Sequence, residues 1–244
     1  MANQSDVKIS RARPAPAYTE GTLNPNPRNS RYGEASVVGL GFKTATQHAD
    51  EGSYFVATNP TPGTGIVMGA AVTSYVETTP FFLVTYATTS GRRLYFDFLK
   101  LVCTVAGVAG TSLNATVAID NAAARYTSGG TAITPVNPNM DDSNTAEGKV
   151  YAGALVAAAA ANKRLLWSDI LRVVIPVIGD TYLIEFGGPT ALSSIASAGT
   201  AVAQVAKQAP PVILGDGDNA SIVLWLPSQS TGSAYELTFG FTER

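Results

Sequence analysis

AYELTFGFTE, residues 234–243, is the segment that indicates the fold class most directly. Its large apolar side chains occupy every second position and are Tyr235, Leu237, Phe239 and Phe241. Because successive side chains of a strand point to opposite faces, this alternation predicts a strand with one buried face. TYLIEFGG (181–188) alternates in the same way, so we expect two half-buried strands in the C-terminal part of the chain.

Similar short runs continue back to about residue 53, separated by clusters of Gly, Asn, Asp, Ser and Pro that are typical of turns. These runs predict further strands over residues 53–58, 65–75, 80–88, 93–107, 112–120, 165–177 and 220–227. TSGGTA (127–132) is interpreted as a turn whose glycines adopt positive φ. Many short strands with few long helices predict an all-β fold, a jelly-roll-like β-sandwich.

Two alanine-rich segments have a less regular pattern. VYAGALVAAAAA (150–161) is an uncharged run of twelve residues, shorter than the roughly twenty that span a bilayer. Alanine favours a helix, but the β-like neighbours favour a buried strand whose short side chains let another sheet or subunit approach closely. In residues 190–210 the apolar spacing is roughly helical, and Pro210 would end such a helix.

Residues 1–50 differ from the rest and are expected to form an extended N-terminal arm ahead of the body, residues 51–244. Prolines at positions 14, 16, 25 and 27 exclude a continuous helix and disfavour a central strand. Residues 1–32 carry five basic and two acidic side chains, a net charge of +3, which leaves −5 on the remainder of the chain.

A segment with so few apolar residues cannot order itself, so the arm is expected to bind a partner surface. We assign the polar contacts and the apolar anchors of this interaction to Arg11, Arg13, Arg28 and Arg31, and to Tyr18, Leu23 and Tyr32. Neither a basic stripe interleaved with aromatic residues nor a membrane-spanning run is present in the sequence. An acidic protein surface is therefore the preferred partner, rather than nucleic acid or a membrane.

The overall composition also favours assembly. Charged residues make up 14% of the chain, against roughly 25% in an average soluble domain. The body surface must therefore consist largely of small and weakly polar residues, and such a surface is typical of proteins that bury it against other subunits.

The sequence offers few residues for catalysis. Its single histidine, His48, has Asp50, Glu51 and Ser53 nearby, but we interpret it as an exposed loop histidine rather than part of a catalytic triad. The single cysteine, Cys103, is expected to be buried and unreactive. We therefore assign no catalytic residue and no cofactor, and expect a protein that is not an enzyme.

Metal sites are not expected either. One histidine and one cysteine cannot form a structural zinc site. The Asp and Asn residues of NMDDSN (139–144) and GDGDNAS (215–221) do not follow the spacing of a calcium-binding EF-hand loop. We interpret them as residues that form Asx-turns.

Two segments resemble virion proteins of tailed bacteriophages. They are AIDNAAARYTSGGTAITPVNPNM (118–140) and GALVAAAAANKRLLWSDILRVVIPVIGDTYLIEFGG (153–188). The resemblance covers about 120–140 residues of the body, does not extend well into the arm, and carries no active-site motif. It implies a jelly-roll subunit that forms homotrimers and decorates or cements a capsid, with a minor tail or fibre component as the alternative location.

The leading hypothesis is a capsid decoration protein on the virion surface, whose arm binds the major capsid protein and neighbouring copies. The alternative is a receptor- or glycan-binding domain of a tail or fibre. In that case the binding surface would comprise residues 126–144 and 214–219.

Overall fold

The computed structural model describes residues 44–69, 74–86, 91–108, 112–122, 124–186, 203–209, 213–215, 220–227 and 232–244. The chain divides into two units, residues 1–42 and 43–244, and every described residue belongs to the second. Residues 1–43 of the predicted arm lie outside the described residues, whereas residues 44–50 form a helix.

Helix α1 (Thr44–Asp50) comes first, and thirteen strands follow it among the described residues. The strands are β1 (Tyr54–Thr58), β2 (Ile66–Val67), β3 (Phe82–Tyr86), β4 (Leu94–Val105), β5 (Leu113–Asp120), β6 (Tyr126–Ile133), β7 (Lys149–Ala157), β8 (Arg164–Arg172), β9 (Thr181–Phe186), β10 (Ala203–Ala209), β11 (Ile213–Leu214), β12 (Ala220–Trp225) and β13 (Ala234–Glu243).

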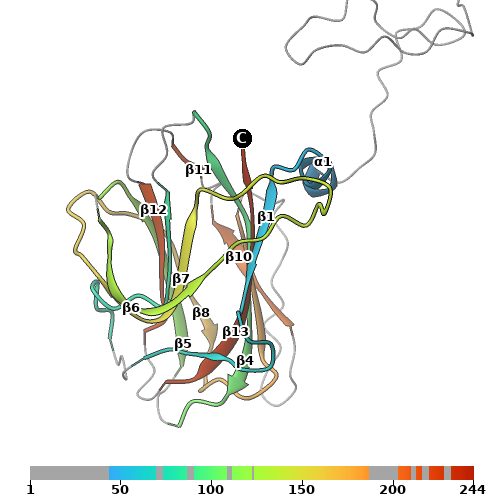
Figure 1. Ribbon diagram of the computed structural model, residues 1–244. Helices are drawn as coiled ribbons and strands as arrows, with labels where there is room; N and C mark the ends of the chain where they lie inside the picture. The colour runs from blue at the N-terminus through green and yellow to red at the C-terminus, as the bar shows by residue number, and fades with distance from the viewer. Residues whose placement is uncertain are drawn as a thin grey trace, which may run out of the picture. The chain divides into compact units, whose positions relative to one another are not determined.

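The strands form two sheets that pack face to face (Figure 1). The seven-stranded sheet has the order β1-β13-β4-β9-β10, with β2 beside β13 and β11 beside β4. The six-stranded sheet has the order β6-β7-β3-β12-β5-β8. Strands β9 and β10 form a parallel pair, whereas the pairs that build the centre of each sheet are antiparallel.

Eight of these strands follow the order of a jelly roll. In chain order they are β1, β3, β4, β5, β8, β9, β12 and β13. The first pairs with the eighth, the second with the seventh, the third with the sixth and the fourth with the fifth, all antiparallel. This nested pairing is that of one long hairpin wound into two sheets, so the predicted all-β, jelly-roll-like sandwich is confirmed. Strands β6 and β7 are an added hairpin beside β3.

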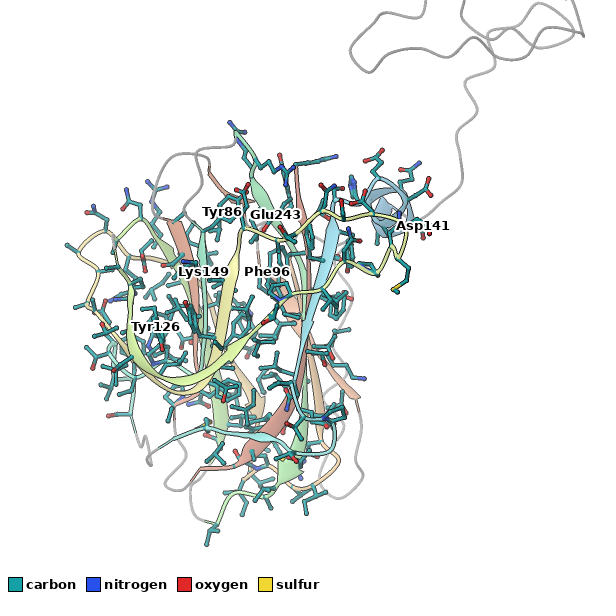
Figure 2. All side chains as sticks on the ribbon, in the orientation of Figure 1. Tyr86, Phe96, Tyr126, Asp141, Lys149 and Glu243 are labelled. Carbon is teal, nitrogen blue, oxygen red and sulfur yellow. The ribbon has the colours of Figure 1, made fainter. Side chains whose placement is uncertain are left out.

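An aromatic core joins the two sheets. Phe239 of β13 packs on Phe82 of β3, with 5.3 Å between the ring centroids. It also packs on Phe96 of β4, at 4.7 Å, and Figure 2 labels Phe96 among the side chains between the sheets. The four alternating apolar residues of segment 234–243 are at most 1% exposed, which confirms the predicted buried face. Each such ring contributes roughly 1.5–3 kcal/mol through burial.

Two of the predicted strands are shorter than expected. Of the described residues within 65–75, which exclude 70–73, two form β2, and these pair with the first two residues of β13. Of residues 165–177, the strand ends at Arg172. Pro176 has no N–H group to donate to a ladder, and residues 177–180 form a turn in which the Asp180 N–H bonds the Val177 carbonyl at 3.1 Å.

Residues 127–132 do not form the predicted turn but part of β6. The expected positive φ is present, at 77° in Gly129 and 66° in Gly130, and it produces irregularities in the pairing of β6 with β7. A Cβ atom on Gly130 would lie 2.7 Å from the Ala152 carbonyl oxygen. Glycine is therefore required because the two strands approach closely at a bulge.

The alanine-rich segments both contain strands. Residues 149–157 form β7, so the predicted buried strand is confirmed up to Ala157, and residues 158–161 lie beyond it. The apolar spacing favoured a helix in part of residues 190–210, but residues 203–209 form β10 parallel to β9, while residues 190–202 and 210 lie outside the described residues. Pairing with β9 outweighs the helical apolar spacing there.

Candidate functional site

A cavity of about 230 Å³ lies beside α1, and we call it the α1 cavity. Its lining comes from α1, β1, β4 and the end of β13 and comprises Ala45, His48, Tyr54, Tyr95, Phe96, Asp97, Thr242 and Arg244. Cavities that bind drug-sized ligands are typically about 300–1,000 Å³. The size of the α1 cavity therefore suits one inserted side chain better than a small molecule.

The α1 cavity presents a carboxylate next to aromatic rings. The Tyr54 hydroxyl donates a hydrogen bond to Asp97 Oδ2 at 2.8 Å, and burial, followed by this bond, raises the pKa of Tyr54 above its usual range. The Arg244 guanidinium carbon lies 4.9 Å from the centroid of the Tyr95 ring. A carboxylate and an aromatic face together are the groups that bind guanidinium or ammonium side chains.

His48 is not the exposed loop residue that its surroundings predict. It lies in α1 and is 9% exposed, because the helix packs this side chain against the β-sandwich. Its Nδ1 lies 3.5 Å from the Glu51 carboxylate. The Ser53 hydroxyl donates to the His48 backbone carbonyl at 3.2 Å rather than to the imidazole, so these residues do not have the geometry of a catalytic triad.

A second cavity, of about 540 Å³, lies between the ends of β5, β8 and β12, and we call it the β5–β8 cavity. Its polar lining includes Asp120, Asn121, Asn162, Lys163 and Arg164. Amide and basic groups around a cavity of this size are suited to a polar or anionic ligand.

A buried ion pair lies next to this second cavity. Arg125 Nε is 3.1 Å from Asp120 Oδ2, and both side chains are fully buried. Asp120 Oδ1 accepts hydrogen bonds from the Ser221 hydroxyl at 2.7 Å and from the Ala122 N–H at 3.1 Å. Oδ1 of Asp120 thus holds the start of the β5–β6 connection against β12, whereas the buried Oδ2 forms the ion pair with Arg125 without a hydrogen bond.

Glu77 extends this cluster to the surface. Its carboxylate accepts the Ala160 N–H at 2.8 Å and pairs with Lys163 Nζ at 2.7 Å. Arg125 Nη2 approaches it at 3.5 Å, and the Glu77 backbone carbonyl accepts the Trp225 Nε1–H at 3.1 Å. The Ala160 bond, followed by Lys163, lowers the pKa of Glu77. These contacts fasten the β2–β3 connection over the outer face of β12.

The end of the sandwich opposite α1 carries a group of exposed apolar side chains, which we call the apolar end. Its members are Val67, Val105, Val108, Val173, Val174, Val177 and Ile178. Val67 and Val105 both pair with Ala234 at the start of β13, whereas Tyr54, which follows α1, pairs with Thr242 near its other end (Figure 1).

Five members of the apolar end come from two neighbouring loops, and Val67 and Val105 are the last residues of β2 and β4. The Gly107 N–H donates to the Pro176 carbonyl at 3.2 Å, and the Gly179 N–H donates to the Cys103 carbonyl at 2.8 Å, so the β4–β5 and β8–β9 connections lie side by side. Val108 is 80% exposed and Ile178 is 68% exposed. Residues 173–179 contain no charged side chain. A contiguous exposed apolar group of this kind is typical of a protein–protein interface.

The Asp- and Asn-rich segment near α1 has a structural role in agreement with prediction. Backbone N–H groups two residues ahead donate to the side-chain oxygens of Asn137, Asn139 and Asp142, which are Asx-turns. Among the described residues no group of three His, Cys, Asp or Glu side chains could hold a metal ion. Figure 2 shows Asp141 of this segment beside α1.

Cys103 is 1% exposed, as predicted. Burial, and then the charge of Asp180, raises the pKa of its thiol to about 11. The thiol is therefore protonated and weakly nucleophilic at neutral pH.

The seven arm residues assigned to partner contacts, from Arg11 to Tyr32, lie outside the described residues. The surface predicted for glycan binding is only partly a loop. Residues 126–133 belong to β6, and Val136 forms a backbone bridge to Val56 that covers the free edge of β1. Residues 216–219 lie outside the described residues.

Comparisons with known proteins give no family for this chain. No protein-family model matches it, and neither a curated protein nor a solved structure shows significant similarity. In the described part of the chain, no helix has the length and apolar character needed to cross a membrane.

Sequence reasoning missed both cavities and the buried ion pair. Tyr54 and Asp97 are 43 positions apart, and Ser221 is 101 positions from Asp120, so their proximity has no local signal. The apolar end was detectable in part, because residues 173–177 were recognised as apolar but were assigned to the strand predicted over residues 165–177.

Proposed function

We propose that this protein is a structural subunit of a bacteriophage virion that decorates and stabilises the capsid surface. The observation that carries the proposal is the apolar end. Seven exposed valine and isoleucine side chains gather there, and burying such a surface against another chain is favourable by about 25 cal/mol per Å² of apolar area. The resemblance of segments 118–140 and 153–188 to phage virion proteins supports the same role.

In this proposal the body forms homotrimers through the apolar end, and the arm, residues 1–50, binds the major capsid protein and neighbouring copies. The contribution of the protein is mechanical, because it links capsomers and raises the barrier to their separation. The exposed side chains of edge strand β8, Leu165 and Ile170, would add to the contact area, since an edge strand has free backbone groups on one side.

The proposal is tested by counting copies in purified virions and by deleting the part of the arm that precedes α1, residues 1–43. A shell component is expected in hundreds of copies per particle, and loss of the arm should abolish binding to capsids that lack the protein. Wild-type occupancy of the truncated protein would disprove the role of the arm, and a handful of copies would exclude a decoration protein.

A second candidate, a glycan-binding domain of a tail or fibre, is favoured by the β5–β8 cavity. Its volume of about 540 Å³ and its amide and basic side chains fit a hydroxyl-rich or acidic sugar. Glycan-array binding by the full chain, lost in Asn121→Ala and Arg164→Ala, would support this candidate, whereas binding that survives both substitutions would exclude this cavity as the site.

A further inference from the structure

The α1 cavity contains a carboxylate oxygen, Oδ1 of Asp97, that accepts no hydrogen bond from the described residues. Asp97 Oδ2 is bonded by the Tyr54 hydroxyl, but no described residue donates a hydrogen bond to Oδ1. The Asp97 side chain is exposed at the mouth of the cavity, so an incoming donor can reach it without displacing a neighbour.

The chemistry of the cavity indicates a guanidinium as the incoming group. Arg244 already places its guanidinium on the Tyr95 ring at this site, which shows that the local geometry accommodates cation–π stacking. A second guanidinium would find the free oxygen of Asp97 and the aromatic walls of the cavity. The volume of about 230 Å³ limits the guest to one side chain of a peptide segment.

The chain itself contains a segment with this chemistry, and in the sequence it precedes α1. Residues 1–43 precede α1, the helix that lines the cavity through Ala45 and His48. Within them RNSRY, residues 28–32, carries two arginines and a tyrosine in five positions. Eleven residues separate Tyr32 from Thr44, a span of at most about 40 Å when extended, so the segment can contact a neighbouring copy that lies within this distance of α1.

We propose that the α1 cavity of one copy binds the RNSRY segment of a neighbouring copy, with Arg28 or Arg31 paired to Asp97. The net charges of the two parts agree with this arrangement, because residues 1–32 carry +3 and the remainder of the chain carries −5. The copies are thereby linked in addition to their contact at the apolar end. The inference rests on the proposed function only in assuming that copies assemble.

Disulfide trapping between two distinguishable full-length copies tests the proposal. One copy carries Ser30→Cys in the arm and the other carries Ala45→Cys in the cavity wall. A disulfide requires Cα atoms about 4.4–6.8 Å apart, so it forms only if the segment lies at the cavity. The native thiol does not interfere, because Cys103 is buried. We expect a disulfide-linked product of the two copies on a non-reducing gel.

Matched variants distinguish a disulfide that forms at a specific contact from one that forms by random collision. Ser10→Cys, beside the other arginine pair of the arm, should give about ten-fold less product than Ser30→Cys. Asp97→Asn should lower the yield from Ser30→Cys about ten-fold, as expected for loss of a charge-assisted hydrogen bond. Asp141→Asn, an exposed carboxylate near α1 that does not line the cavity, should leave the yield unchanged.

Each other outcome overturns the proposal. Absence of product, or equal product from Ser10→Cys, would show that RNSRY does not bind at the cavity. If Asp97→Asn leaves the yield of the disulfide-linked product unchanged, Asp97 does not form the proposed ion pair. A single chain can also carry both Ser30→Cys and Ala45→Cys. If it forms only an intramolecular disulfide, the segment does not link neighbouring copies. The test uses purified protein without capsids. Its failure would leave the proposed virion role standing, and failure of the virion role would leave the contact between copies standing.

Discussion

Arg125 Nε lies 3.1 Å from Asp120 Oδ2 in a position where neither side chain is exposed to solvent. Both residues belong to segment 118–140. The pair closes the connection between β5 and β6 and abuts the ring of Trp225, which lies 5.9 Å from the Arg125 guanidinium carbon. These two residues of the segment thus have a role in folding, whatever the protein binds.

Replacement of one partner of this pair should be strongly destabilising. Arg125→Met leaves the Asp120 charge buried without its cation, and loss of one partner of a buried pair typically costs about 3–5 kcal/mol. The double variant Asp120→Asn, Arg125→Met should lose less than the sum of the single variants, because it removes both charges. Urea denaturation measures the free energies of unfolding.

Arg164→Met is the control for this prediction. Arg164 is exposed and forms no ion pair with a described residue, so its replacement should change stability by less than about 0.5 kcal/mol. Similar losses for Arg125→Met and Arg164→Met would show that the buried pair does not stabilise the fold.

Acid should weaken the attachment of the β2–β3 connection through Glu77. Its folded-state pKa is lower than the ordinary value of 4.5, through the Ala160 N–H and then Lys163. A lowered pKa contributes stability above the unfolded-state pKa, and this contribution is lost as the pH falls through the folded-state pKa. Glu77→Gln should therefore lose less stability than the wild type when the pH is lowered from about 6 to about 3.

Glu243→Gln provides a comparison of opposite sign. Burial raises the pKa of Glu243, although the N–H groups of Glu147 and Gly148 act against this shift. A raised pKa contributes stability below the unfolded-state pKa that is lost as the pH rises, so Glu243 opposes the acid loss in the wild type and this substitution should make the loss larger. An acid response in Glu77→Gln equal to that of the wild type would contradict the role of Glu77.

Gly240→Ala should displace Tyr54, whose side chain lines the α1 cavity. A Cβ atom at this position would lie 2.5 Å from Phe98 Cε1 and would collide with the Tyr54 hydroxyl, which holds Asp97. Such overpacking typically costs about 1–3 kcal/mol. Gly215→Ala is the matched control, because a Cβ atom there meets nothing within 4 Å. Equal thermal stability of the two variants would refute the predicted collision.

The alanine-rich segment 149–161 should tolerate enlargement only where its side chains are exposed. Ala152 is fully buried in the core, so Ala152→Leu should cost about 1–3 kcal/mol through overpacking. Ala159 lies beyond the strand and is exposed, so Ala159→Leu should be nearly neutral. Thermal unfolding of both variants tests this difference, and a destabilised Ala159→Leu would indicate that other chains pack on this surface.

Charged residues in the apolar end should prevent assembly without unfolding the body. In Val174→Asp and Ile178→Asp, association would bury a carboxylate that has no partner, which costs several kcal/mol. Light scattering should show a smaller molecular mass, with an unchanged urea midpoint. Met140→Asp, at a position that is 94% exposed outside the apolar end, should keep the wild-type mass. Loss of mass in all three variants would point to a nonspecific effect.

The alternation of apolar and polar residues made most of the strands predictable. The segments that were predicted wrongly have physical causes. Segment 234–243 became β13 with the predicted ends because its period is complete. Residues 127–132 were assigned to a turn because Gly129 and Gly130 are typical of turns, but pairing with β7 makes them a bulged strand. His48 was placed in a loop because a helix of seven residues, α1, has too short a pattern to detect.

The candidate site was less accessible to sequence reasoning than the fold. The arginines of the arm were recognisable from composition. Their proposed acceptor was not, because Tyr54 and Asp97 come from different strands and meet only when β1, β13 and β4 align. Likewise, nothing local distinguishes Asp120 and Arg125 from exposed charges.

The sequence by itself determined the all-β class and the change in composition between arm and body, because strand periodicity and composition are properties of neighbouring residues. Only the tertiary structure decided the nested strand order, the burial of the Asp120–Arg125 pair, the α1 cavity and the exposure of the apolar end. Each of these depends on which strands pair and which loops meet, and those contacts join residues far apart in the chain. Their energies come from burial against distant partners, which no single stretch of sequence contains.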